Sequence, residues 1–207
     1  MKSRNFEERT AQFLRECGIS GKSALDIGAR YSPEYGAGLF AGLQEFGVED
    51  YTILEIFNGY VKELKEHDYS VVQGDVRQIQ RYFLPESFDI VCWVHGPEHL
   101  NNFTEICESI DKLKRLTKQW LIISFPIGEE KQGAIDGNPY QRHRYTIPSV
   151  QKILDCFNKK DNVRYTAYKR LPRKTGHYTT KFNPNAVIVY EGRLQNLDKR
   201  TEIKTSS

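Results

Sequence analysis

The 207-residue sequence has no apolar run approaching the length of a membrane span, and its charged amino terminus lacks the apolar core of a signal peptide. Its four cysteines are widely spaced and form neither a CxxC motif nor a Cys/His metal-ligand pattern. No stretch rich in proline, glycine and serine divides the chain. These absences predict a single cytoplasmic domain with reduced cysteines, and no metal-ligand spacing that calls for a bound metal.

Net charge is also low, because 30 basic and 27 acidic residues leave a formal charge of +3. This excess is too small to indicate a nucleic-acid-binding protein. Positive charge is nevertheless concentrated in one late stretch without acidic residues, which contains Lys169, Arg170, Arg173, Lys174 and Lys181. We interpret this stretch as a solvated loop, with a binding edge for an anionic substrate as the alternative.

The first half of the chain contains four strand-like apolar runs that each end in a polar or acidic residue. They cover residues 24–28, 51–55, 70–75 and 88–95. In an open parallel α/β sheet, ligands bind beyond the carboxyl ends of the strands, where the strand order reverses. A glycine turn, a glutamate and an aspartate at successive strand ends therefore predict a site that holds a nucleoside.

The periodicity of the whole chain predicts alternating strands and helices. Helical spacing of apolar residues is found at 4–17, 34–46, 59–67, 103–117 and 148–157. A fifth strand at 120–125 is apolar throughout, which is typical of parallel strands covered on both faces. Strands 163–170 and 185–191 follow one another without room for a crossover helix, so we expect them to pair antiparallel.

These elements predict an α/β fold: a Rossmann-like, doubly wound, mostly parallel seven-stranded sheet with a C-terminal antiparallel hairpin, in three layers (α/β/α). We expect one domain over residues 1–195 and a polar, frayed tail over 196–207. Five β-α units followed by an antiparallel pair resemble the class I S-adenosylmethionine-dependent methyltransferases. The branch with quinone-biosynthesis type enzymes is the most similar. The resemblance covers about residues 20–157 with motifs, and the final hairpin by architecture alone.

The first motif of the resemblance is Leu25-Asp26-Ile27-Gly28-Ala29-Arg30. It implies cofactor contacts at Asp26, Gly28, Ala29 and Arg30, with Gly28 letting the cofactor pass close to the backbone. The family usually has a second glycine where Arg30 stands, so Arg30 either covers the cofactor carboxylate or narrows the pocket. The family often has a third glycine at Ser32, and the two missing glycines disfavour a dinucleotide, whose pyrophosphate requires G-x-G-x-x-G.

The next two strand ends carry the acids of the resemblance. Glu55, followed by Ile56, stands where the family has a carboxylate that accepts hydrogen bonds from both ribose hydroxyls. Its apolar neighbours make an acid costly there unless it meets a partner. Asp75 matches the acid that receives the adenine amino group, with the backbone of Val76 at the ring. A helix cap is a second, compatible role for Asp75.

The fourth strand leads into Val94-His95-Gly96-Pro97-Glu98-His99. The resemblance implies that His95 lies near the methionine part of the cofactor or near the acceptor. Glu98 and His99 are expected to support the structure.

The loop over 126–146 contains Gly137-Asn138-Pro139-Tyr140-Gln141-Arg142-His143, which is similar to an acceptor-side segment in a subset of these enzymes. Asn138, Tyr140 and His143 are therefore candidate substrate-binding residues. His143 is also the better candidate for a proton acceptor, because the unperturbed pKa of histidine lies near neutrality. An exposed loop histidine without a role is the alternative.

Taken together, the resemblance implies an enzyme that uses S-adenosylmethionine to methylate a small-molecule acceptor by direct displacement at the sulfonium methyl. His95 and His143 are its candidate catalytic residues. Two alternatives stay open: a non-catalytic binding module with the same fold, and an RNA methyltransferase that uses the basic stretch 169–181.

Overall fold

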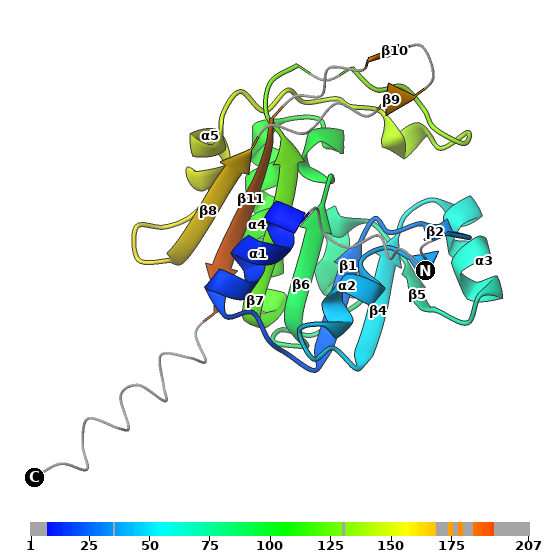
Figure 1. The fold of residues 1–207 in the computed structure, drawn as a ribbon, viewed down its shortest axis with the longest axis horizontal. Coiled ribbons are helices and arrows are strands. Elements are labelled where there is room, and N and C mark those ends of the chain that lie inside the picture. The colour runs from blue at the N-terminus through cyan, green and yellow to red at the C-terminus, as the bar shows by residue number, and fades with distance from the viewer. Residues whose placement is uncertain are drawn as a thin grey trace, which may run out of the picture.

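The computed structural model describes residues 8–34, 36–129, 131–168, 174–175, 178–179 and 184–192. Its centre is one sheet in the order β5-β4-β1-β6-β7-β11-β8 (Figure 1). The strands are β1 (Ser23–Ile27), β4 (Asp50–Glu55), β5 (Ser70–Gln73), β6 (Phe88–Val94), β7 (Thr117–Pro126), β8 (Asn162–Tyr168) and β11 (Asn185–Glu191). The pairs among the first five of these strands are parallel, whereas β11 is antiparallel to both β7 and β8. The predicted fold class, including the terminal hairpin, is confirmed.

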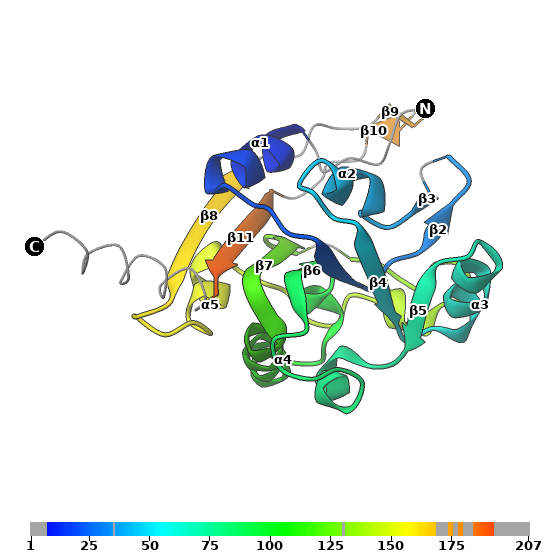
Figure 2. The same cartoon turned by 90° about the horizontal axis from the view of Figure 1, so that it is seen from below.

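Helices cover both faces of the sheet, and Figure 2 shows α1 and α2 on one side and α4 on the other. On the first side, α1 (Glu8–Cys17), α2 (Phe40–Gln44) and α3 (Asn58–Glu66) contribute buried leucines to one core cluster. On the second side, α4 (Phe103–Leu116) and α5 (Val150–Leu154) contribute buried isoleucines to another. Burial of apolar side chains on both faces makes β1, β6 and β7 almost continuously apolar.

The helix predicted over 34–46 is much shorter than its periodicity suggested, and this part of the prediction is wrong. A small hairpin pairs β2 (Tyr31–Ser32) with β3 (Gly36–Ala37), and β3 lies where the helix was expected to begin. Gly36 and Gly38 have φ of 78° and 43°, a left-handed conformation that interrupts a right-handed helix. Only α2 keeps the predicted helical conformation.

Three short 3-10 helices lie in the connections at the carboxyl edge: η1 (Val76–Arg81), η2 (Pro97–His99) and η3 (Pro139–Gln141). A further pair of two-residue strands, β9 (Lys174–Thr175) and β10 (Tyr178–Thr179), pairs antiparallel. Most of the predicted basic stretch 169–181, and the whole predicted tail 196–207, lie outside the described residues. The domain limits of 1–195 therefore stay a prediction.

Two of the four cysteines are bonded to each other, which their spacing did not indicate. Cys107 of α4 and Cys156 after α5 form a disulfide, whereas Cys17 and Cys92 are buried free thiols. The prediction of reduced cysteines is therefore wrong for Cys107 and Cys156. Disulfides are uncommon in the cytosol of most organisms, and the cytoplasmic location stays a prediction. None of the helices in the described residues is both long and apolar enough to cross a membrane.

Candidate functional site

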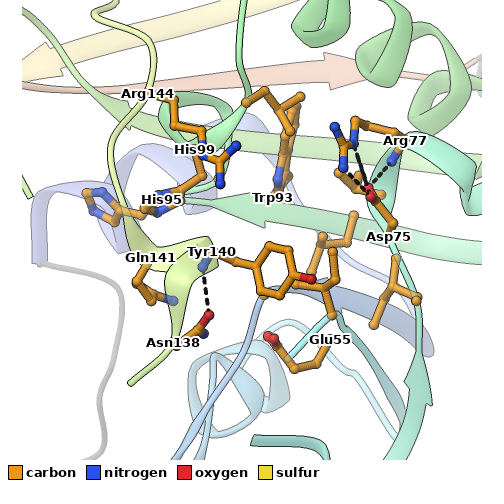
Figure 3. A pocket seen from close by; sticks show the side chains of 18 of the residues that line it. Glu55, Asp75, Arg77, Trp93, His95, His99, Asn138, Tyr140, Gln141 and Arg144 are labelled. Atoms are coloured by element: carbon orange, nitrogen blue, oxygen red, sulfur yellow. Dashed lines mark hydrogen bonds and ion pairs between the residues drawn. The ribbon is translucent and has the colours of Figure 1, made fainter. Parts of the chain in front are cut away.

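A pocket of about 770 Å³, its open mouth included, lies beyond the carboxyl ends of β1, β4, β5 and β6. The strand order reverses at β1, which lies between β4 and β6. This is the position at which open α/β sheets bind ligands. The loop over 131–145 closes the opposite side of the pocket through Asn138, Tyr140, Gln141 and Arg144 (Figure 3).

The glycine turn after β1 borders the pocket with its backbone. Gly28 has φ of 81°, and its N–H donates to the carbonyl of Leu54 at 2.9 Å. No atom lies within 4 Å of the position that a Cβ would take. The backbone of the turn is therefore open to the pocket at Gly28.

Asp26 is buried and bonded to the segment that follows β3. Its carboxylate is 3% exposed and accepts hydrogen bonds from the hydroxyl of Tyr51 at 2.5 Å and the N–H of Leu39 at 2.9 Å. Burial raises the pKa of this carboxyl, although both hydrogen bonds oppose the rise. Asp26 is not among the residues that line the pocket, and the buried Ala29 is not among them either.

Arg30 pairs with an acid of the loop that covers the pocket. Its Nη1 donates to Asp136 at 3.0 Å, and the hydroxyl of Tyr60 donates to the same carboxylate at 3.1 Å. Arg30 is outside the pocket lining, so its side chain does not narrow the pocket.

Glu55 is the buried acid of the pocket. It is 2% exposed, and its Oε1 accepts a hydrogen bond from the N–H of Phe57 at 2.6 Å. Burial raises the pKa of Glu55 to about 7, against the opposing effect of the backbone N–H groups of Phe57 and Ile56. Glu55 and Ile56 both line the pocket, and Figure 3 shows Glu55 below the ring of Tyr140 in this view.

Asp75, at the end of β5, is paired with Arg77. Its Oδ2 accepts from Arg77 Nη2 at 2.6 Å, and its Oδ1 accepts from the Arg77 N–H at 2.9 Å (Figure 3). The second bond caps η1, so the cap predicted as a possible role for Asp75 is present. Burial opposes ionisation of Asp75, but the hydrogen bonds and charge of Arg77 outweigh it and lower the pKa of Asp75. Asp75, Val76 and Arg77 all line the pocket.

His95, after β6, lines the pocket in a conformation that is unusual for a residue other than glycine. Its φ is 52°, and its N–H donates to the carbonyl of Ser124 at 2.8 Å. Its Nδ1 lies 3.3 Å from Oε1 of Glu98, and its Nε2 lies 3.4 Å from the side-chain nitrogen of Asn185. His99 and Trp93 also line the pocket (Figure 3).

The loop residues divide between the pocket and its margin. Asn138 is 1% exposed and lines the pocket, and its Oδ1 accepts from the N–H of Tyr140 at 2.9 Å. Tyr140 also lines the pocket and is 43% exposed. His143 is not in the lining, and its ring lies 5.0 Å from the ring of His99.

Several residues that line the pocket were not predicted as site residues from the sequence: Arg77, Trp93, His99, Gln141 and Arg144. Arg77, Gln141 and Arg144 lie within a few positions of predicted site residues, so proximity to the motifs was the available signal. The association of Glu98 and His99 with His143 had no local signal, because it depends on how the loop folds back onto η2.

No known family profile matches the sequence, and no curated protein matches it. Solved structures match in fold. An S-adenosylmethionine-dependent methyltransferase from Archaeoglobus fulgidus has a TM-score of 0.56 at 16% identity, over 89% of this chain and 93% of that one. Another, from Methanosarcina mazei, has a TM-score of 0.61 at 13% identity, over 92% and 99%.

Magnesium protoporphyrin IX methyltransferase from Synechocystis PCC 6803, solved with bound S-adenosylmethionine, has a TM-score of 0.56 at 15% identity, over 90% of this chain and 77% of that one. At sequence identities this low, the matches show a shared fold and do not show a shared activity. The chain has the class I S-adenosylmethionine-dependent methyltransferase fold, as the resemblance in its sequence predicted.

Proposed function

We propose that this protein transfers a methyl group from S-adenosylmethionine to a small-molecule acceptor. The observation that carries the proposal is the buried carboxylate of Glu55, which lines a pocket together with the bare backbone turn at Gly28. A carboxylate in this position is costly unless a ligand or a proton satisfies it. Two neighbouring ribose hydroxyls are donors that suit its two oxygens.

The remaining residues of the lining fit the other parts of the cofactor. Asp75 and Val76 lie at the next strand end and would hold an adenine ring, and His95, also in the lining, would face the methionine part. Asp26, Ala29 and Arg30 would act on the cofactor only through the turn, because none of them lines the pocket. The site thus fits the predicted cofactor in the chemistry of its donors and acceptors.

When bound, S-adenosylmethionine supplies an electrophilic methyl group on a positively charged sulfur. The residues of the chain would hold the acceptor in line with that methyl group, and such orientation supplies about 7–11 kcal/mol in good intramolecular reactions. Trp93 and Tyr140 would exclude water from the reacting atoms. A base is needed only for a hydroxyl or a protonated amine, and His95 in the lining or His143 at its margin would serve.

A small-molecule acceptor is supported by the size of the pocket and by one similar structure, whose name refers to a porphyrin substrate. The alternative of a non-catalytic module relied on Arg30 and the missing glycines. Because Arg30 is bonded to Asp136 outside the lining, it gives that alternative no support. The alternative of an RNA substrate relied on the stretch 169–181, most of which lies outside the described residues.

Isothermal titration with S-adenosylhomocysteine tests the cofactor site. We expect binding to the wild-type protein and a dissociation constant about tenfold or more larger for Glu55→Ala, because a charge-assisted acceptor is lost. Glu49→Ala is the matched control, since Glu49 is an exposed glutamate that pairs only with Lys22 among the described residues. Absence of heat at millimolar ligand would reject the proposal. Binding without methyl transfer to a broad panel of acceptors would favour the non-catalytic module.

A further inference from the structure

Three side chains that the methyl-transfer proposal does not require as a group meet at the margin of the pocket. Glu98, His99 and His143 each present a ligand atom, and these atoms all lie within 4.8 Å of one another. Glu98 and His99 belong to η2, whereas His143 comes from the loop after β7. One carboxylate and two imidazoles at this separation can coordinate a single ion.

The backbone fastens the two segments to each other. The N–H groups of Arg144 and Tyr145 both donate to the carbonyl of Glu98, at 2.9 and 3.1 Å. The N–H of His143 donates to the carbonyl of Gln132 at 3.1 Å. The two residues that follow His143 are thus bonded to Glu98 itself, and these bonds keep the three side chains close together.

The carboxylate of Glu98 is buried and only half satisfied. Glu98 is 1% exposed, and its Oε2 has no hydrogen-bond partner among the described residues. Its Oε1 lies 3.3 Å from Nδ1 of His95, which orients the carboxylate. A buried carboxylate oxygen without a partner is costly, and a bound cation would satisfy it.

His99 is oriented as a metal ligand would be. Its Nδ1 lies 3.2 Å from the carbonyl of Arg142, which can only accept a hydrogen bond, so Nδ1 carries the proton. The neutral ring then has its lone pair on Nε2. A histidine that binds a metal through one nitrogen commonly donates from the other to a backbone carbonyl in this way.

We propose that Glu98, His99 and His143 form a binding site for a divalent transition-metal ion of the Zn²⁺ type. Two imidazoles and one carboxylate favour such an ion over Mg²⁺, which prefers oxygen ligands. Three protein ligands leave coordination positions for water or for an oxygen atom of another molecule. His99 lines the pocket, so an open position can face it.

This site favours an acceptor that offers a hydroxyl or another oxygen atom to the ion, because an oxygen ligand would fill an open position. The preference for an oxygen-bearing acceptor rests on the proposed function, whereas metal binding does not.

The test is titration of the full chain with Zn²⁺ after treatment with a chelator, together with elemental analysis of the dialysed protein. We expect one Zn²⁺ per chain, and binding about tenfold or more weaker for Glu98→Gln and for His143→Ala, since each removes one ligand. His67→Ala is the control for adventitious histidine binding and should bind as the wild type does. His67 stacks on Tyr31 at 3.6 Å and is not part of the cluster. Mg²⁺ should bind more weakly than Zn²⁺.

Thermal melts in the presence of chelator show whether Glu98→Gln and His143→Ala are folded. If one of them is not, the Zn²⁺ affinity of the other tests the site. Absence of Zn²⁺ uptake, or uptake that both variants retain, would overturn the site. S-adenosylhomocysteine is titrated separately into the chelated protein. Nucleoside binding without Zn²⁺ binding would reject the metal site alone, and the reverse result would reject the methyltransferase proposal alone.

Discussion

Arg30 donates to Asp136 at 3.0 Å and so joins the turn after β1 to the loop that covers the pocket, 106 positions later in the chain. Tyr60 of α3 donates to the same carboxylate. The residue that replaces a glycine of the family motif therefore holds the loop and does not enter the site. Asp136 and Gly137 both have left-handed φ, of 52° and 71°, which makes the tight turn that presents the carboxylate.

Arg30→Ala should loosen this loop without a large loss of stability. An exposed ion pair contributes about 0–1 kcal/mol, so we expect cleavage by chymotrypsin near Tyr140 and Tyr145 to accelerate up to about fivefold. Arg15→Ala is the matched control, because Arg15 pairs with Glu45 on the surface at 3.6 Å. Equal cleavage rates for the two variants would show that Arg30 does not hold the loop.

The raised pKa of Glu55 predicts that ligand binding depends on pH. In the proposed site, ribose hydroxyls would donate to the ionised carboxylate, and Glu55 ionises with a pKa of about 7. The dissociation constant of S-adenosylhomocysteine should therefore increase about tenfold between pH 8 and pH 6, since only the ionised form binds well. Calorimetry at the two pH values measures this change. If the dissociation constant of Glu55→Gln changes equally between the two pH values, a group other than Glu55 is responsible for the pH dependence.

The raised pKa of Glu55 also makes the stability of the ligand-free protein depend on pH. Ligand binding should strengthen as the pH rises, whereas the stability of the ligand-free protein should fall. The folded state keeps the proton of Glu55 up to about pH 7, whereas the unfolded chain releases it near its ordinary value of 4.5. Stability of the wild type relative to Glu55→Gln should thus fall by roughly 3 kcal/mol as the pH rises from 4 to 8. Urea unfolding of both proteins across this range provides the measurement, and parallel curves would contradict the shift.

Tyr51→Phe should destabilise the protein, because it removes the hydroxyl that donates to the buried Asp26 at 2.5 Å. A buried acceptor that loses a donor costs about 1–3 kcal/mol. Tyr165→Phe is the control, since Tyr165 is 55% exposed on β8. Denaturant unfolding at pH 7 compares the two variants, and a loss for Tyr51→Phe no larger than that of the control would contradict the role of this pair.

Asp75 has two roles that different substitutions separate. Asp75→Ala should lower the free energy of unfolding by about 1 kcal/mol, because the cap of η1 is lost. Asp75→Asn keeps a good capping side chain and should restore most of that stability, although it removes the ion pair with Arg77. Thermal melts give the comparison. If asparagine destabilises as much as alanine, the ion pair and not the cap stabilises this turn.

Much of the fold follows from local patterns. The runs 24–28 and 88–95 match β1 and β6 to within a residue at each end, because apolar side chains buried on both faces leave continuous runs in the sequence. The helix expected at 34–46 failed because Gly36 and Gly38 adopt left-handed conformations that periodicity does not reveal. The bond between Cys107 and Cys156 was not predicted either, since it requires that α4 and the end of α5 lie side by side.

The sequence by itself determined which strand ends carry Gly28, Glu55 and Asp75, because each of these residues stands at the end of an apolar run. Only the tertiary structure decided what the side chains contact. Arg30 meets Asp136, Asp26 meets Tyr51, and Glu98 and His99 meet His143 through bonds between segments far apart in the chain. Strand ends are set by the local period of burial, whereas these partners depend on how loops fold across the sheet edge, and no local pattern encodes that.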